Sequence, residues 1–383
     1  MLTFFAILAL LSILLSLWQW VATWSFPLHR RVSAGGFTPG VTVLKPLKGL
    51  DDNVIGCLRS WFTQDYAGAM QTILGVASPD DPACDAVRQL IKEFSNCDAQ
   101  LLVCPESLGV NGKVSSLIQM QRQAKHNITV VSDADVLVPR DFLANVVAPL
   151  REPAVGLVNC FYRLANPVNV GMRWEAVAIN ADFWSQVLQG RSLQPLDFAL
   201  GAVMATRRAE LEKIGGFESL ADYLADDFQL GNRVVRIAGK RIELCPVVVD
   251  CRHGPMTWGE VWAHQLRWAR TVRVCKPLPY FASVLSNATL WPLLWVLLQP
   301  GKWSLATLAM ALFIRVVAAF ALQKRLGFVP GQAAYWWLPP LKDLFQFALW
   351  IGAFAGQHIV WRGQRLRLQP DGRLVPVSNP APK

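Results

Sequence analysis

The feature that most constrains this chain is an uncharged apolar run over residues 2–24. It is long enough for a membrane-spanning helix of about 20 residues. The run exceeds the apolar part of a secretory leader, no basic segment precedes it, and no small-residue cleavage site closes it. A basic cluster of His29, Arg30 and Arg31 follows directly. The positive-inside rule therefore predicts a transmembrane helix in residues 1–28, with the chain beyond it in the cytosol.

Apolar residues gather a second time in the last third of the chain. Two runs, residues 281–298 and 304–322, flank residues 299–302, whose Pro-Gly centre is typical of the turn in a helical hairpin. A third run over residues 341–360 begins close to a lysine and an aspartate. We therefore predict a C-terminal membrane region of two or three helices within residues 281–361.

Charges within and after these runs limit how the segments can meet lipid. Arg315 lies near the middle of its run, where a charge costs roughly 2.5–3.5 kcal/mol on insertion scales, so it is expected to face protein or the interface. Three C-terminal spans would place the basic tail, residues 362–383, outside the cytosol, against the positive-inside rule. One of these segments is therefore expected to be re-entrant or interfacial.

Between the two apolar regions, residues 40–255 have the composition of a globular domain. Short β-branched runs alternate with amphipathic stretches, as in a sheet covered by helices on both faces. The expected strands are residues 41–45, 72–77, 100–104, 128–132 and 155–160, and the expected helices include residues 52–62, 82–94 and 113–124. This alternation predicts an α/β domain with a mostly parallel sheet and with ligands at the carboxyl ends of its strands.

Several classes of function are disfavoured by the sequence. No G-x-G-x-x-G follows an expected strand, which argues against a dinucleotide-binding domain, and Gly112-Lys113 lacks the flanking residues of a Walker A loop. The net charge of +10 lies beside tryptophans and apolar runs, so it indicates an anionic membrane surface and a phosphate-bearing substrate, with no nucleic acid. Eight scattered cysteines lack metal-site spacing and are expected to be buried structural residues.

Two carboxylates, Asp133 and Asp135, follow the expected strand 128–132. Paired carboxylates at a strand end suit a hard cation, Mg²⁺ or Mn²⁺, that is bound partly by protein and partly by phosphate oxygens. A capped turn or a solvated acidic loop is the structural alternative. The position directly after a strand favours a metal site.

Two further carboxylates have both a chemical and a structural interpretation. Asp81 follows a strand and could contact the base or ribose of a nucleotide, or it could cap the helix that starts near Pro82. Asp227, next to Asp226, could act as the general base for an acceptor hydroxyl, or it could open the amphipathic stretch 228–237.

An amphipathic, tryptophan-rich segment, residues 256–280, precedes the C-terminal apolar runs. It contains His264, Arg267, Trp268 and Arg270. The arginines could clamp a diphosphate and the tryptophans could lie at the membrane interface. A plain interfacial helix would explain the same composition.

Five strings of the sequence, taken together in this order, resemble the ceramide glucosyltransferase family and its bacterial relatives. The first is the opening Val-Leu-Lys-Pro-Leu-Lys-Gly, and the second is Ser-Pro-Asp-Asp-Pro-Ala, with Asp81 matching the family's first aspartate. Asp133 matches its second aspartate and Asp227, in Leu-Ala-Asp-Asp-Phe, its third. The strings are residues 43–49, 78–83, 133–135, 224–228 and 264–268, and the resemblance extends to residues 361–368. His264 departs from the family's Q/R-x-x-R-W.

The resemblance implies a GT-A-type fold, a UDP-sugar donor, a divalent cation and inversion at the anomeric carbon. By analogy, Asp227 is the base, and Asp133 and Asp135 hold the metal, Mg²⁺ or Mn²⁺. The implied donor-binding residues are Lys45, Asp81, Asn111, Lys113, Asp133, Arg267 and Trp268, and the implied acceptor-binding residues are Gly201, Met204 and His264.

We therefore expect an integral membrane hexosyltransferase with a cytosolic catalytic domain, in the inner membrane if the source is bacterial. Ceramide glucosylation with UDP-glucose is the favoured reaction, and the alternative is transfer of N-acetylglucosamine to a hopanoid lipid. A polysaccharide synthase would need a secretion channel, for which two or three segments are too few. A non-catalytic membrane scaffold would not need the aspartates and Arg267-Trp268.

Overall fold

The structure is a computed structural model that describes residues 2–32, 36–327, 331–361 and 364–377. Met1, Arg362, Gly363 and the end of the expected basic tail, beyond residue 377, lie outside the described residues. The chain forms two compact units that each combine distant segments. Unit 1 comprises residues 1–27, 163–194 and 255–371, and unit 2 comprises residues 28–162, 195–254 and 372–383.

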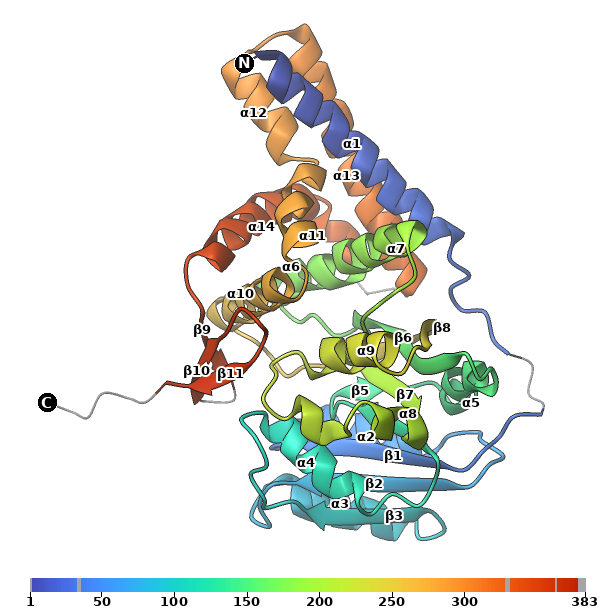
Figure 1. Cartoon of the computed structure of the whole chain (residues 1–383). Helices are drawn as coiled ribbons and strands as arrows, with labels where there is room; N and C mark the ends of the chain where they lie inside the picture. The colour runs from blue at the N-terminus through green and yellow to red at the C-terminus, as the bar shows by residue number, and fades with distance from the viewer. Residues whose placement is uncertain (1, 33–35, 328–330, 362–363, 378–383) are drawn as a thin grey trace, which may run out of the picture. The chain divides into compact units, whose positions relative to one another are not determined.

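Unit 2 is built on an eight-stranded sheet with the order β3-β2-β1-β4-β7-β6-β8-β5 (Figure 1). Strands β1 to β4 pair in parallel, whereas β7 runs antiparallel to both β4 and β6. The strands are β1 (Val41–Leu47), β2 (Met70–Val76), β3 (Asp98–Val103), β4 (Ile128–Ser132), β5 (Val136–Leu137), β6 (Val155–Leu164), β7 (Val203–Arg207) and β8 (Arg241–Cys251). The expected α/β class with a mostly parallel sheet is confirmed.

Helices cover this sheet because their apolar faces need burial. Helices α3 and α4 pack on β1–β3, and α5 and α9 pack on β8. Val87 and Leu90 of α3 are buried against Leu74 and Val76 of the sheet, which is the expected outcome for an amphipathic helix. The helices of unit 2 are α2 (Val54–Phe62), α3 (Ala83–Glu93), α4 (Gly112–Gln121), α5 (Phe142–Val147), η1 (Ala148–Arg151), α8 (Arg208–Lys213), η3 (Phe217–Leu220) and α9 (Asp226–Arg236).

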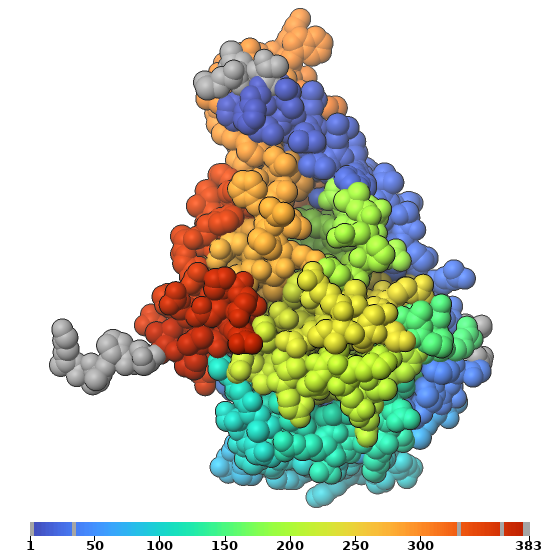
Figure 2. Space-filling view, viewed as in Figure 1, coloured from blue at the N-terminus to red at the C-terminus, as the bar shows by residue number. Residues whose placement is uncertain are grey.

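Unit 1 is mainly helical. Helix α1 packs against α7, α12 and α13, and α10 packs against α6 and α14; Figure 2 shows α1 in blue alongside the orange α12 and α13. Its elements are α1 (Leu2–Ser25), α6 (Val170–Val177), the π-helix η2 (Ala178–Phe183), α7 (Trp184–Leu193), α10 (Trp258–Cys275), α11 (Pro277–Ala282), η4 (Ser283–Ser286), α12 (Leu290–Leu298), α13 (Lys302–Leu326), η5 (Gln332–Tyr335), α14 (Leu338–Phe354), β9 (His358–Trp361) and β10 (Gln364–Leu368).

The apolar helices of unit 1 differ in length, which decides whether a helix can cross a membrane. Residues 4–25 of α1, and helix α13, are long and apolar enough to do so. The run expected over residues 281–298 is divided into two helical parts that meet at an angle of 54°, so it forms a broken span or a re-entrant loop. Helix α14 has 17 residues and is shorter than a usual span. One C-terminal segment was expected to be re-entrant or interfacial. Two segments fit that expectation: the bent segment of residues 277–298 and helix α14.

Two of the expected boundaries differ from the observed arrangement. Residues 163–194 fall within the expected catalytic range of 40–255, but they group with unit 1. The expected basic tail contains strands β10 and β11 (Leu374–Pro376), and the residues that follow Asp371 belong to unit 2. Leu366 and Leu368 are buried while Arg365 and Arg367 are exposed, so the alternation that makes this segment a strand was visible in the sequence.

An ion cluster inside unit 1 explains how Arg315 is accommodated. Its guanidinium donates to both oxygens of Asp343 and to Asp182 Oδ2, at 2.9–3.0 Å. Lys342 Nζ lies 2.5 Å from Asp182 Oδ2, and Thr289 donates to Asp343 Oδ2 at 2.8 Å. Two cations and two anions balance within the buried cluster, as expected for charges removed from water. The cluster joins α13, α14, η2 and the break before α12.

Replacing Arg315 by leucine is expected to lower the free energy of unfolding by roughly 3–5 kcal/mol, because two buried carboxylates lose a shared cation. The double variant Arg315→Leu with Asp343→Leu removes one of these carboxylates, so it should regain part of the loss. Thermal unfolding in detergent measures both effects. Lys324→Leu, which removes an exposed cation from the same helix, is the control. Equal stability of the single and double variants would contradict the pairing.

Candidate active site

The loop between β4 and β5 carries the predicted metal ligands, Asp133 and Asp135. Strand β4 ends one residue before Asp133, and β5 begins one residue after Asp135. Val136 pairs with Cys251 of β8, and the Asp133 N–H donates to the Ala202 carbonyl at 3.2 Å. Neighbouring strands therefore fix both ends of the loop. The two carboxylates lie at the edge of the sheet where α/β domains bind ligands.

Lys113, in the first turn of α4, brings distant acidic residues together. Its Nζ lies 2.8 Å from Asp133 Oδ1 and 3.3 Å from Asp226 Oδ2, and its side chain is 10% exposed. Burial favours the neutral amine, but the charges of Asp133 and Asp226 outweigh burial and raise the pKa of Lys113 above its ordinary value. A permanent positive charge therefore joins the loop after β4 to the start of α9.

Lys45, in β1, lies beneath the same loop with its side chain fully buried. Its Nζ donates to Ser132 Oγ at 3.0 Å and to the Asp133 carbonyl at 2.7 Å, and lies 4.9 Å from the centre of the Trp61 ring. Burial lowers the pKa of Lys45 to about 8. Lys45 was predicted to contact the donor, and in this structure it supports the backbone at Asp133 from inside the protein.

His253 is a site residue that no sequence motif identified. Its Nε2 lies 3.0 Å from Asp135 Oδ2. Burial alone would raise the pKa of Asp135, but the hydrogen bond and charge of His253 lower it overall. His253 lies just beyond the end of β8, and its place at a strand end next to a paired strand is the only sequence signal that could have identified it.

Asp226 and Asp227 open helix α9, where the helix dipole favours negative charge. The Phe228 N–H donates to Asp227 Oδ1 at 2.7 Å. Burial and the charge of Asp226 raise the pKa of Asp227 to about 7, against the opposing charge of Lys113. A carboxylate with a pKa close to the working pH is suited to general base catalysis.

Gly201 and Met204, the predicted acceptor residues of unit 2, have different surroundings. A Cβ atom added at Gly201 would lie 2.9 Å from Asp227 Oδ2, so glycine leaves room for that carboxylate. Met204 belongs to β7 and is 1% exposed. Its side chain packs inside the sheet, and the geometry gives no support to a contact between Met204 and an acceptor.

Asn111 and Asp81, both predicted to bind the donor, are engaged with backbone groups. Asn111 Oδ1 accepts from the N–H groups of Lys113 and Val114 at the start of α4. The Asp81 carboxylate accepts from the Gly49 N–H at 3.0–3.1 Å and from the N–H of the first residue of α3 at 2.9 Å. The capping interpretation of Asp81 therefore describes one of its contacts. Direct contact of either residue with a nucleotide stays a prediction.

The predicted motif His264–Trp268 lies on α10 in unit 1. His264 Nδ1 lies 2.6 Å from Oε1 of the buried Glu175, and Gln265 Nε2 donates to the same oxygen at 3.0 Å. The His264 ring packs edge-on against Trp268 with 5.1 Å between ring centres. The donor and acceptor roles of His264, Arg267 and Trp268 stay predictions, because the aspartates belong to unit 2.

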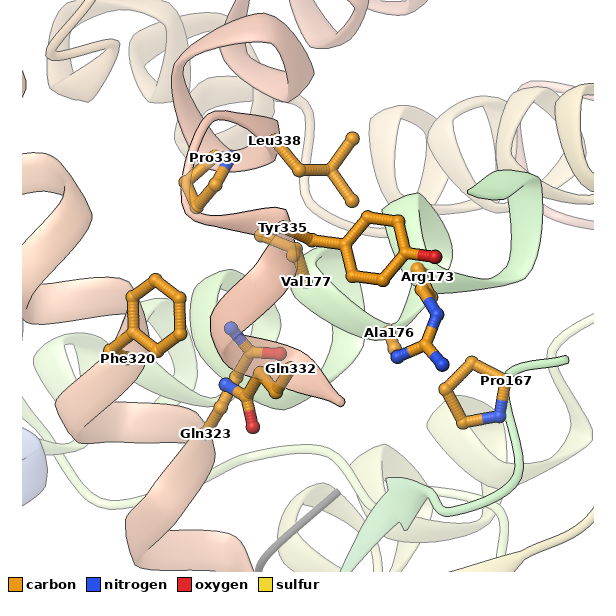
Figure 3. A pocket seen from close by; sticks show the side chains of 10 residues that line it. All are labelled: Pro167, Arg173, Ala176, Val177, Phe320, Gln323, Gln332, Tyr335, Leu338 and Pro339. Carbon is orange, nitrogen blue, oxygen red and sulfur yellow. The ribbon is translucent and has the colours of Figure 1, made fainter. Parts of the chain in front are cut away.

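A small pocket in unit 1, partly open to solvent, is lined by residues of α6, α13, η5 and α14. Figure 3 shows the polar groups of Arg173, Gln323, Gln332 and Tyr335 together with an apolar wall that includes Phe320 and Leu338. The Arg173 guanidinium lies over the Tyr335 ring at 4.4 Å.

The carboxylate oxygens at this edge of the sheet are suitable ligands for a divalent cation that also binds the phosphates of a substrate. Among the residues the structure describes, no three or more histidine, cysteine, aspartate or glutamate side chains converge as a complete cage. Mg²⁺ is usually held by one or two carboxylates together with substrate phosphates and water. Asp133 and Asp135 provide such a pair at the sheet edge, and the Asp133 side chain is 39% exposed.

Comparison with known proteins identifies the family of the chain and its fold. Residues 2–374 match the sequence profile of the family described as Glycosyl transferase family 21. The ceramide glucosyltransferase 1 of Caenorhabditis elegans is 24% identical over 372 residues, which are 92% of this chain and 77% of the relative. The ceramide glucosyltransferase of Candida albicans is 32% identical over 122 residues, which are 29% of this chain and 22% of the relative.

Two further comparisons concern sugar transfer and the fold. An N-acetylglucosaminyltransferase of Rhizobium leguminosarum bv. viciae is 25% identical over 247 residues, covering 61% of this chain and 55% of the relative. The structure of the mannosyltransferase PcManGT from Pyrobaculum calidifontis, in complex with GDP-Man and Mn²⁺, has a TM-score of 0.53 and 23% identity, and it covers 91% of this chain and 98% of that one. The chain belongs to glycosyl transferase family 21 and is a hexosyltransferase with the GT-A fold.

Proposed function

We propose that this enzyme transfers glucose from UDP-glucose to the primary hydroxyl of ceramide, with inversion at the anomeric carbon. The observation that carries the proposal is the cluster in which Lys113 bridges Asp133 and Asp226, with Asp227 beside it. This cluster combines a site for a diphosphate with a candidate base. The ceramide acceptor is supported by the names of the Caenorhabditis and Candida relatives.

In the proposed reaction, the acceptor oxygen attacks the anomeric carbon while the bond from that carbon to the diphosphate breaks. Asp227 takes the hydroxyl proton, so the developing alkoxide is not left charged. Lys113 contributes fixed positive charge where the leaving group gains negative charge. A divalent cation, when held by Asp133 and Asp135, neutralises the diphosphate. The presence of Mn²⁺ in the PcManGT structure supports a divalent cation in an enzyme of this fold.

The proposal places unit 1 in a membrane, with the catalytic unit on the cytosolic side. Helix α1 and helix α13 are the two helices suited to cross, and the segment formed by α11, η4 and α12 provides a third, bent passage. Entry through α12 and return through α13 would leave Lys324 and Arg325 on the same side as the basic cluster after α1. The positive-inside rule supports this arrangement, which also keeps the tail cytosolic and resolves the conflict found in the sequence.

One observation favours a second candidate, transfer of N-acetylglucosamine to a lipid such as a hopanoid. The Rhizobium relative carries the name N-acetylglucosaminyltransferase and matches 61% of this chain. Among the described residues of unit 2, no contact around Asp133 or Asp227 selects between the two sugars. The same base and the same diphosphate site would serve both reactions.

Incubation of the purified protein with labelled UDP-sugar and a mixed lipid extract tests the proposed function. UDP-glucose and UDP-N-acetylglucosamine are offered separately, with added Mg²⁺, added Mn²⁺ or a chelator, and labelled lipids are identified by mass. We expect labelled glucosylceramide that is lost with the chelator. A labelled hopanoid would support the second candidate, and no labelled lipid from a preparation that binds UDP would overturn both.

Replacing Asp227 by asparagine is expected to lower lipid glycosylation by about 10²–10⁴-fold, because the hydroxyl proton loses its acceptor. Binding of UDP should persist, and calorimetric titration with UDP is the control. In the unaltered enzyme, kcat should rise with pH through about 7, because Asp227 must be deprotonated to act. Turnover by Asp227→Asn close to that of the unaltered enzyme would remove Asp227 from this role.

The same pKa shift predicts an effect on stability. The folded-state pKa of Asp227 lies above the ordinary value, so the folded protein binds more protons than the unfolded chain between about pH 4 and pH 7. This group therefore makes the protein less stable as pH rises through that window. Asp227→Asn should unfold at a higher temperature than the unaltered protein at pH 8, and at a similar temperature at pH 4.

Replacing Gly201 by alanine is expected to displace the Asp227 carboxylate, since the new Cβ would lie 2.9 Å from Oδ2. We expect about a tenfold or greater fall in kcat, as for small displacements of a catalytic group. The melting temperature should change little, because the carboxylate can rotate away. The control is Gly190→Ala, where an added Cβ meets nothing within 4 Å. Full activity of Gly201→Ala would contradict the close approach.

A further inference from the structure

The chain from Gly372 to Leu374, here called the C-terminal strap, runs beside the loop that precedes the candidate base. Tyr223 and Arg373 form an antiparallel bridge. The Leu374 N–H donates to the Asp222 carbonyl at 2.7 Å, and the Leu224 N–H donates to the Gly372 carbonyl at 3.4 Å. We infer that this strap positions Asp226 and Asp227 for catalysis; the inference rests on the proposed role of Asp227.

The opposite side of the same loop is held by the segment that leads into α4. The Val110 N–H donates to Asp222 Oδ1 at 3.0 Å, and the Asn111 N–H donates to the Ala221 carbonyl at 2.8 Å. Asn111 Nδ2 donates to the Tyr223 carbonyl at 2.8 Å. Residues 221–224 therefore lie between two segments that are far apart in the sequence. One of these segments also carries Lys113, which contacts Asp226.

The Tyr223 side chain links the strap to helix α9. Arg373 Nε donates to Tyr223 Oη at 3.3 Å, and the Arg373 guanidinium lies 5.7 Å from the ring centre. The guanidinium of Arg233, on α9, lies 5.5 Å from the same ring centre. Cation–π contacts of this kind favour a fixed ring position. The aromatic ring therefore connects the strap to the helix whose first turn contains both carboxylates.

The two ends of the strap, Gly372 and Leu374, are both buried. Leu374 is 3% exposed. Gly372 is buried and has a φ of +88°, a backbone angle that residues with a Cβ atom rarely adopt. Residues 221–225 form a turn with a single β-bridge and belong to no helix or continuous strand. Such a loop opens easily unless neighbouring segments satisfy its backbone groups. The strap supplies an acceptor for Leu224 and a donor for Asp222.

Two chain lengths test the strap: a chain that stops after Asp371 and one that stops after Val377. The longer chain keeps the strap and is the matched control. We expect the shorter chain to lose about tenfold or more in kcat, as for a displaced catalytic group, with the KM for UDP-glucose nearly unchanged. A raised KM for UDP-glucose at unchanged kcat would overturn the positioning role, because it would mean that Arg373 binds the UDP-sugar.

The single replacement Leu374→Pro serves where truncation prevents folding. Proline removes the N–H that donates to Asp222, whereas Leu374→Ala keeps that N–H and alters only the packing. Leu374→Pro should therefore lower kcat more than Leu374→Ala. In an Asp227→Asn background, Leu374→Pro should cause little further loss, because both changes act on the same base. An equal further loss in that background would overturn the inference.

Hydrogen exchange of the backbone amides gives a readout that does not depend on the substrate. Removal of the strap should speed exchange within residues 221–225 by about tenfold or more, as expected for a lost backbone hydrogen bond, while β4 stays protected. Unchanged exchange in residues 221–225 would overturn the proposed positioning role of the strap, whichever lipid the enzyme uses. Absence of glycolipid from the unaltered enzyme, with faster exchange in the shortened chain, would overturn only the proposed reaction.

Discussion

The contact of one buried ammonium with two carboxylates underlies the rest of the catalytic unit. Asp133 is distant in the sequence from the adjacent Asp226 and Asp227, and like charges brought together repel. Lys113 contacts Asp133 and Asp226 directly, so it offsets this repulsion at the centre of the group. Asn111 fixes the turn that presents Lys113. The geometry of the proposed donor site therefore depends on the first turn of α4.

Much of the sheet was predictable because its strands carry strong local patterns. Residues 128–132 were expected as a strand and form one, with the two predicted metal ligands directly after them. The antiparallel insertion of β7 between β4 and β6 was not expected, since a strand's direction depends on a partner that local sequence does not reveal. The bend within residues 281–298 was not expected, although Asn287, whose side chain accepts from the Thr289 and Leu290 N–H groups at the break, is a helix-capping signal in the sequence.

Residue roles were less predictable than element positions. Asp226 and Asp227 are adjacent and chemically identical, and only the fold shows that one contacts Lys113 while the other lies against Gly201. Lys45 looked like a donor ligand, yet its ammonium is buried under the loop and bonded to Ser132. These distinctions depend on which way a side chain points from its strand or helix. Motif spacing does not supply that information.

Because the strap lies at residues 372–374, the order of synthesis has a consequence for the time at which the enzyme becomes active. The ribosome makes every described helix of unit 1 before it makes the strap. The loop before Asp226 therefore has only one of its two flanking segments until the last apolar helices have left the ribosome. On the proposed role of the strap, a nascent chain with a finished sheet would still lack one support of Asp227. The contacts of the strap with this loop would then form only after the apolar helices of unit 1 have been made.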